Sequence, residues 1–157
     1  MKVVLFLDFD GVLHPEPCHP DGYLCHIDRV QDVLREFVDD VEIVISSSWR
    51  DFHSLTELRD MFAPDIGGLV VGVTPNIKTP SPDWLPGIAP RHEREWEIET
   101  WLKSNRPWGT PWLAIDDRAQ WFREDSPNLL LTASRHGFAM EQQATLRDML
   151  QERLELL

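Results

Sequence analysis

Residues 1–14, with the sequence MKVVLFLDFDGVLH, decide the fold class of this chain. The apolar run at residues 3–7 is too short to cross a membrane, and its side chains are typical of a strand buried on both faces of a sheet. Two carboxylates, Asp8 and Asp10, follow the run, and Gly11 allows the backbone to turn sharply after them. Open α/β sheets bind ligands at the carboxyl ends of their strands. We therefore expect both carboxylates to point into one cleft there.

The rest of the chain alternates between short apolar runs and segments with helical periodicity. Further strands are predicted at residues 42–45, 69–73, 112–115 and 128–131, and helices at residues 28–38, 54–63, 93–104, 119–123 and near the C-terminus, where Leu146, Met149, Leu150 and Leu154 lie on one face. Short apolar strands that alternate with helices indicate a parallel sheet with helices on both sides. The predicted fold is therefore α/β, a three-layer Rossmann-like arrangement around a central parallel sheet.

Capping residues predict where some of these helices begin. Asp28 with Gln31 is expected to cap the first helix, and Ser54 with Glu57 has the pattern of a capping box. Ser48 is also expected to act as a helix cap. Each cap marks a boundary, because its side chain accepts a hydrogen bond from the first turn of the helix.

Length and composition indicate a single globular domain over residues 1–157, because no linker or repeat divides the chain. Residues 74–90 contain five prolines and are expected to form a long irregular loop. Two cysteines form no disulfide framework, and the N-terminus does not have the pattern of a signal peptide. We therefore expect a cytoplasmic protein without a membrane-spanning segment.

The formal net charge is -12, which argues against broad binding to nucleic acids or anionic membranes, since both need a basic face. It does not exclude one phosphate held by a metal and a few arginines. The loop at residues 14–26 contains three histidines and two cysteines, but no CxxC or HxxxH unit. A surface flap is therefore expected there, and the sequence does not decide whether it binds a ligand.

Polar side chains follow three of the predicted strands. Asp8 and Asp10 follow the first strand, Ser46 the second, and Asp116 and Asp117 the fourth. The carboxyl ends of parallel strands lie at one edge of the sheet, so these residues are expected to converge. Several carboxylates in one cleft repel each other unless a cation lies among them, and oxygen ligands without His or Cys suit Mg²⁺. The sequence therefore predicts a magnesium site at this edge.

Such a site suits phosphoryl transfer, because a metal, a hydroxyl and an arginine together can bind a phosphoryl group and stabilise its oxygens. Asp8, at the tip of the first strand, would attack phosphorus. Asp10 would protonate the leaving oxygen and then activate water.

These elements resemble the haloacid dehalogenase (HAD) superfamily of phosphatases. The motifs that carry the resemblance are LFLDFDGVLHP at residues 5–15, EIVISSSWR at residues 42–50 and WLAIDDRAQWF at residues 112–122. The resemblance implies that Asp8 is the nucleophile that forms an aspartyl-phosphate, Asp10 the general acid and base, and Ser46 the hydroxyl that binds phosphate. It also implies that Asp8, the backbone carbonyl of Asp10 and Asp117 hold Mg²⁺, with Asp116 acting directly or through water. The acid at residue 10 favours a phosphatase, since the dehalogenating members lack it.

The sequence does not decide which other residues bind the phosphate. The superfamily places a Lys or Arg near a helix start between the second and last motifs, and Arg91 and Arg94 both lie there. Arg94 is favoured because it is nearer the helical pattern that follows. Arg50, behind the triple serine, is a further candidate, and Ser47 is an alternative to Ser46.

The segments DFDGVLHP, SSSWR and REWEIETWL more specifically resemble the HAD domains attached to RNA-repair proteins, and in outline the phosphatase half of polynucleotide kinase-phosphatases. The connections in which this superfamily carries cap domains are here too short or too rich in proline for a full cap. A capless, open site suits the end of a polymer or a protein side chain. Trp49, Trp84 and Trp96 are candidates for stacking on a base or an apolar group there.

The first functional hypothesis is a Mg²⁺-dependent phosphomonoesterase with an open site, acting through an aspartyl-phosphate on a large substrate such as a DNA or RNA end. A nucleotide or small-metabolite phosphatase and a phosphoprotein phosphatase are the alternatives within enzymes. The alternative from another class is a non-catalytic, receiver-like regulatory module. Receivers carry their acidic pair at the first strand, whereas here the pair Asp116 and Asp117 comes late.

Overall fold

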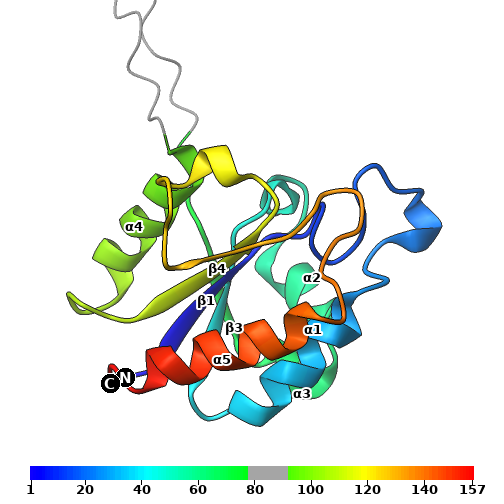
Figure 1. The fold of residues 1–157 in the computed structure, drawn as a ribbon. Helices are drawn as coiled ribbons and strands as arrows, with labels where there is room; N and C mark the ends of the chain where they lie inside the picture. The colour runs from blue at the N-terminus through cyan, green and yellow to red at the C-terminus, as the bar shows by residue number, and fades with distance from the viewer. Residues whose placement is uncertain (78–91) are drawn as a thin grey trace, which may run out of the picture.

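The computed structural model describes residues 1–77 and 92–157. Within these residues, five parallel strands form one sheet in the order β3-β2-β1-β4-β5 (Figure 1). The strands are β1 (Val3–Leu7), β2 (Val41–Ile45), β3 (Val70–Val73), β4 (Trp112–Asp116) and β5 (Leu129–Leu131). Every residue of β1 is fully buried, because this strand lies in the middle of the sheet. The predicted parallel sheet is confirmed.

Helices cover both faces of this sheet (Figure 1). They are α1 (Ile27–Leu34), α2 (Leu55–Asp60), α3 (Pro64–Gly67), α4 (Glu93–Asn105) and α5 (Gln142–Leu154), with short 3-10 helices η1 (Pro20–Gly22), η2 (Arg35–Phe37), η3 (Ser48–Asp51) and η4 (Ala119–Trp121). Alternate side chains of β1 enter two separate cores. Leu5 belongs to the core that contains side chains of α1, α2, α3 and α5, and Phe6 belongs to the core that contains side chains of α4. The predicted three-layer α/β arrangement is therefore confirmed.

The helix starts test two of the predicted caps. Asp28 is not a cap, because α1 begins one residue earlier and His26 holds the capping position without a side-chain hydrogen bond. Asp28 instead accepts a hydrogen bond from the side-chain amide of Gln31, within the helix. The capping box of Ser54 and Glu57 is confirmed, and both of its reciprocal hydrogen bonds are present at the start of α2.

The register of the sheet aligns the carboxyl ends of three strands. Leu7 of β1 pairs with Ile45 of β2 and with Ile115 of β4. The residue that follows each of these is polar, and the three are Asp8, Ser46 and Asp116. Backbone hydrogen bonds continue the alignment past the paired residues, from the N–H of Asp8 to Ile115 and from the N–H of Ser46 to Leu7. The three polar side chains therefore start from one edge of the sheet.

The connections between strands in the described residues carry no folded insertion of the size of a cap domain. The connection from β1 to α1 contains only η1, and the connection from β2 to β3 contains η3, α2 and α3. Of the predicted irregular loop at residues 74–90, residues 74–77 have no regular structure and the rest lies outside the described residues. None of the described helices is long and apolar enough to span a membrane.

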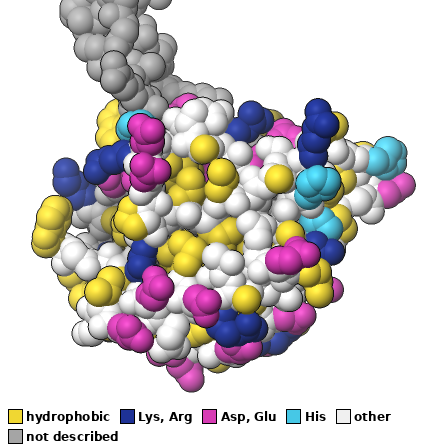
Figure 2. Space-filling model, viewed as in Figure 1, with side chains coloured by type: hydrophobic (Ala, Val, Ile, Leu, Met, Phe, Trp, Pro, Cys, Tyr) yellow, Lys and Arg dark blue, Asp and Glu magenta, His cyan; other side chains and the backbone are white. Residues whose placement is uncertain are grey.

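Figure 2 shows one face of the molecule, on which Asp and Glu side chains lie among Lys and Arg side chains. The basic side chains on this face form no continuous patch. This distribution agrees with the net charge of -12.

Candidate active site

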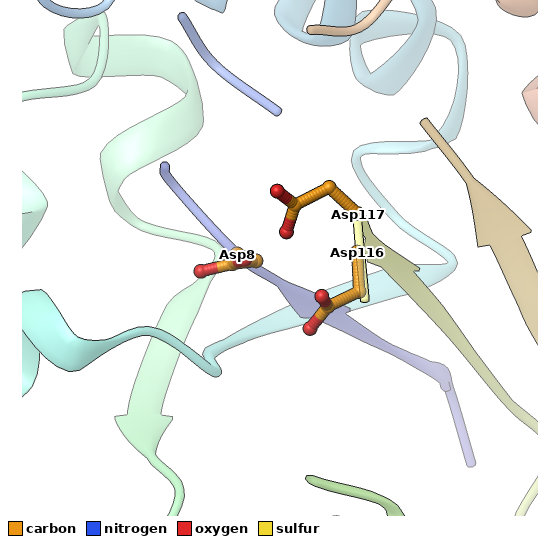
Figure 3. A group of neighbouring side chains, drawn as sticks. All are labelled: Asp8, Asp116 and Asp117. Atoms are coloured by element: carbon orange, nitrogen blue, oxygen red, sulfur yellow. The ribbon is translucent and has the colours of Figure 1, made fainter. Parts of the chain in front are cut away.

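Three carboxylates converge at the carboxyl edge of the sheet (Figure 3). Asp8 follows β1, Asp116 is the last residue of β4, and Asp117 comes next in the chain. One carboxylate oxygen from each of them lies within 4.8 Å of the others. Asp8 and Asp116 are 4% and 1% exposed. Two buried carboxylates beside a third make a strongly acidic group in a part of the protein that water hardly reaches.

Burial and mutual repulsion disfavour negative charge on this group. Burial first, and then the neighbouring carboxylates Asp116 and Asp117, raise the pKa of Asp8 well above its usual range. Burial raises the pKa of Asp116 to about 7, although the Arg94 guanidinium opposes the shift. A bound cation would remove this penalty, because it favours the ionised form of every carboxylate around it.

The donor set fits a hard divalent cation. It consists of carboxylate oxygens, without the nitrogen or sulfur ligands that zinc and copper prefer. One oxygen of Asp116, Oδ2, is buried and has no hydrogen-bond partner among the described residues. The Nε of Arg94 lies 3.6 Å from it. A buried oxygen without a partner in an acidic group is one that a bound cation could satisfy.

A loop after β5 fixes the position of Asp117. The hydroxyl of Ser134 donates a hydrogen bond of 2.6 Å to Oδ2 of Asp117. The hydroxyl of Thr132 donates a hydrogen bond of 2.7 Å to the carbonyl oxygen of Gly11, in the turn after Asp8. Thr132 and Ser134 are not among the site residues predicted from the sequence. Their position could have indicated this role. Both follow a short apolar strand, and polar residues that follow three other strands had already been predicted to form the site.

Asp10 lies apart from the three converging carboxylates and has its own partners. Its Oδ1 lies 2.8 Å from Nε2 of His14 and accepts a hydrogen bond of 3.0 Å from the indole N–H of Trp49. The hydrogen bond with His14 is the main reason that the pKa of Asp10 lies below its ordinary value. Gly11 has a positive φ of 75°, as its predicted role in a sharp turn requires. The backbone thus separates Asp8 and Asp10 into different surroundings.

The three serines after β2 have different environments. Ser46 is buried, and its hydroxyl has no hydrogen-bond partner among the described residues. Ser47 is also buried, but its hydroxyl oxygen accepts the backbone N–H of Trp49 and caps η3. Ser48 is the first residue of η3, so the prediction that it is the cap is wrong by one residue. The extended backbone of Ser47 gives its side chain the capping position, because η3 starts directly after it.

Arg94, in the first turn of α4, is buried beside the carboxylates. Its Nε lies 3.6 Å from Oδ2 of Asp116 and 4.0 Å from Oε1 of Glu97. Its guanidinium lies over the ring of Trp121, 4.9 Å from the ring centre. Its Nη1 is buried and has no hydrogen-bond partner among the described residues. Arg94 therefore has a free N–H group close to the acidic group.

Arg50 has a different role from Arg94 in the structure. Its Nη2 donates a hydrogen bond of 2.7 Å to Glu97, and its Nη1 donates one of 2.7 Å to the carbonyl oxygen of Ser47. Glu97 also accepts the backbone N–H of Ile77. The side chains of Arg50 and Glu97 are 7% and 4% exposed, so this is a buried ion pair. Sequence reasoning missed Glu97, because nothing in its local pattern marks it as buried.

The remaining candidates lie elsewhere. Arg91 and Trp84 fall outside the described residues. Trp96 lies on α4 in a groove of about 650 Å³, with Lys103 and Trp108 among the lining residues and none of the three converging aspartates. Trp49 belongs to the surroundings of Asp10, as its hydrogen bond shows.

A sequence model of the HAD domain in Swiss Army Knife RNA repair proteins matches residues 4–143. The chain belongs to this family. No curated protein matches the sequence. The resemblance to the HAD superfamily, and to its RNA-repair type, is thereby confirmed. Membership in a HAD family points to a phosphatase-type hydrolase, and the buried aspartates could bind the metal ion that such domains typically use.

Proposed function

We propose that this HAD domain is a Mg²⁺-dependent phosphomonoesterase that removes a terminal phosphate from a nucleic acid through an aspartyl-phosphate at Asp8. The observation that carries the proposal is the convergence of Asp8, Asp116 and Asp117 at the sheet edge from which the unpartnered hydroxyl of Ser46 also starts. A buried hydroxyl without a partner is rare in a folded protein and is expected where a ligand supplies the partner.

The roles follow from these positions. A carboxylate oxygen of Asp8 attacks phosphorus, and Asp10 gives a proton to the leaving oxygen from its protonated form, which its lowered pKa makes the minor form at neutral pH. Ser46 and Arg94 donate hydrogen bonds to the phosphoryl oxygens, and Ser47 and Arg50 support them through the backbone of η3 and the ion pair with α4. Asp10 then takes a proton from the water that releases the phosphate from Asp8.

Mg²⁺ would be held by Asp8, Asp116, Asp117 and the backbone carbonyl of Asp10. When bound, it would neutralise the carboxylates and the oxygens of the phosphoryl group as negative charge gathers there. Its ligands need to be ionised, and a bound cation would oppose the effect of burial, which raises the pKa values of Asp8 and Asp116.

A nucleic-acid end is proposed as the substrate for two reasons. The family is named for RNA-repair proteins, and the described residues contain no cap that would enclose a small metabolite. The acidic surface is compatible with this substrate if recognition is confined to the terminal phosphate and the nucleotides next to it. We also propose that residues 1–157 act as one hydrolase domain.

The test is a panel of phosphate esters with Mg²⁺ or with EDTA. It contains p-nitrophenyl phosphate, RNA and DNA oligonucleotides with a 3′- or 5′-phosphate, nucleoside monophosphates and a phosphopeptide. Asp8→Asn is the inactive variant, and Asp39→Asn, the same change at an exposed aspartate, is the control. We expect Mg²⁺-dependent release of phosphate, highest for one type of oligonucleotide end, with wild-type rates in the control.

Other outcomes select the alternatives. A preference for nucleoside monophosphates or for the phosphopeptide would show that the substrate is not a nucleic-acid end, but it would leave the proposed reaction unchanged. A stable phosphoprotein without turnover would support a receiver-like module instead. Failure to hydrolyse any member of the panel would reject the phosphomonoesterase.

A further inference from the structure

Two ring N–H groups form hydrogen bonds to the same oxygen of Asp10. Nε2 of His14 lies 2.8 Å from Oδ1, and Nε1 of Trp49 lies 3.0 Å from it. One carboxylate oxygen has two lone pairs, so these two donors fill its capacity to accept hydrogen bonds. Among residues 1–77 and 92–157, no hydrogen bond reaches Oδ2. The side chain is 34% exposed, which leaves Oδ2 open to a ligand.

The backbone decides which nitrogen of His14 carries the proton. The N–H of Leu24 donates a hydrogen bond of 3.2 Å to Nδ1 of His14. A nitrogen that accepts a hydrogen bond has no proton, so the neutral ring carries its proton on Nε2. His14 therefore donates to Asp10. The indole N–H of Trp49 can only donate, so both partners present hydrogen to the same oxygen.

Both donors are held rigidly before any substrate binds. His14 is 1% exposed, and its ring packs 4.9 Å from Tyr23 and 5.6 Å from Trp49, measured between ring centres. The indole of Trp49 is flanked by His53 at 5.4 Å and by Phe9 at 5.2 Å. Packed aromatic rings of this kind lose little freedom when a ligand arrives. The orientation of the Asp10 carboxyl group is therefore built into the fold.

We propose that His14 and Trp49 are positioning residues that reserve Oδ1 of Asp10 and leave Oδ2 as the only oxygen that exchanges a proton with the substrate. The proposal rests on the proposed function, in which Asp10 is the general acid and base. Neither residue touches the phosphoryl group in this account. They act through Asp10, by fixing which of its oxygens carries the proton and where that oxygen lies.

The proposed role requires that the proton is on Oδ2 in both steps of the reaction. In the first step an oxygen of Asp8 bonds to phosphorus, the bond from phosphorus to the leaving oxygen breaks, and that oxygen takes the proton from Oδ2. In the second step water bonds to phosphorus, its proton goes to Oδ2, and the bond from phosphorus to Asp8 breaks. If the carboxyl group could turn freely, the proton would be on the wrong oxygen or in the wrong place for part of the time.

The dependence on the leaving group distinguishes positioning from simple structural support. p-Nitrophenolate is a weak base and leaves without a proton, whereas the alkoxide of an alkyl ester needs one. For both esters, kcat/KM reports the first step, in which the phosphoryl group is transferred to Asp8. Loss of positioning is therefore expected to harm the alkyl ester more than the aryl ester, whereas general damage to the fold harms both equally.

The experiment compares kcat/KM for p-nitrophenyl phosphate and for glycerol 2-phosphate in four variants. Trp49→Phe keeps a ring but removes the N–H, and His14→Leu removes the other donor. His14→Gln can restore a donor at the position of Nε2. Trp112→Phe, at a half-buried ring beside Phe6, is the control for changing a tryptophan. We expect Trp49→Phe and His14→Leu to lower kcat/KM for glycerol 2-phosphate by about 10- to 100-fold more than for p-nitrophenyl phosphate. His14→Gln is expected to recover part of the loss.

Equal losses for the two esters, or no loss, would overturn the proposal. A second measurement does not depend on activity: ¹⁵N NMR of the histidine rings is expected to show His14 with its proton on Nε2. A proton on Nδ1 of the neutral ring would contradict it. If the wild type hydrolyses neither ester, or if Asp8→Asn remains active, the proposed function fails instead, and the NMR result still tests how Asp10 is held.

Discussion

Gly11 and Asp117 approach each other so closely that no side chain fits at residue 11. A Cβ atom built on Gly11 would lie 2.1 Å from Oδ2 of Asp117 and 2.5 Å from its Cγ. The backbone of Gly11 also has a positive φ of 75°. The glycine of the first motif thus has two functions, since it turns the chain after Asp10 and leaves room for the carboxylate of Asp117, directly after β4.

Gly11→Ala is therefore expected to displace Asp117 and weaken metal binding. Gly109→Ala is the matched control, because Gly109 also has a positive φ, of 83°, but no atom lies within 4 Å of its Cβ position. Both variants carry the backbone strain of about 1 kcal/mol, and only Gly11→Ala meets the clash. Thermal unfolding with and without Mg²⁺ measures the difference. The Mg²⁺-induced rise in Tm should disappear in Gly11→Ala and persist in Gly109→Ala, and an equal rise in both would contradict this account of residue 11.

Stability without metal is expected to fall as the pH rises from about 4 to 7. The pKa of Asp116 is about 7 and that of Asp8 is also raised, whereas both are about 3.9 in an unfolded chain. In this window the folded state keeps protons that the unfolded state has lost, so the free energy of unfolding decreases with pH. Tm measured in EDTA from pH 5 to 8 tests this, and Asp116→Asn should flatten the dependence.

Mg²⁺ should reverse this trend. The cation binds the ionised carboxylates, so its stabilising effect is expected to be larger at pH 8 than at pH 5. The same thermal scans with saturating Mg²⁺ provide the measurement. An equal rise in Tm at both pH values would mean that Mg²⁺ does not bind to the groups with raised pKa.

The buried ion pair of Arg50 and Glu97 predicts a large cost for removing one partner. Arg50→Met leaves the buried carboxylate of Glu97 without its hydrogen-bonded cation, and the Nε of Arg94, 4.0 Å away, compensates this charge only in part. The free energy of unfolding is therefore expected to fall by about 3 to 5 kcal/mol. The double variant Arg50→Met/Glu97→Gln removes the uncompensated charge and should be more stable than the single one. Urea denaturation of the three proteins measures both effects. If Arg50→Met is as stable as the wild type, the ion pair does not contribute to the stability of the fold.

Arg94 is expected to contribute to phosphate binding rather than to stability alone. Arg94→Met removes the N–H groups beside the carboxylates, and a hydrogen bond to a charged group contributes about 1.5 to 3 kcal/mol. The inhibition constant of inorganic phosphate should rise by about 10- to 100-fold in this variant. An unchanged constant would assign the role of the third motif to another residue, and Arg91→Met is the next variant to measure.

The sequence predicted the parts of the site that follow directly from strand ends. Asp8, Ser46 and Asp116 each come immediately after an apolar run, and parallel strands have to bring such residues to one edge. The pairing of Arg50 with Glu97 was not predictable in this way, because the two residues are on different elements and meet only after α4 packs on the sheet. The charged residues of α4 suggest a solvated face, but Arg94, Glu95 and Glu97 are buried.

The surroundings of Asp10 show the same limit. The proximity of His14 in the sequence gave no indication that its ring would donate to Asp10, since this depends on the turn at Gly11 and on the backbone of Leu24. The cap at Asp28 was wrong for a related reason. Local patterns predict which residues can cap a helix, whereas packing of the preceding loop decides where the helix begins.

The most direct test of the central claim is to trap the phosphorylated protein. With p-nitrophenyl phosphate, whose leaving group needs no proton, Asp10→Asn should slow only the second step, so that acid quenching after mixing with this substrate and Mg²⁺ captures the aspartyl-phosphate. Mass spectrometry is expected to find one added phosphoryl group, sensitive to hydroxylamine and located on Asp8. Substrate turnover by the wild type without such a species in Asp10→Asn, together with full activity in Asp8→Asn, would contradict the account.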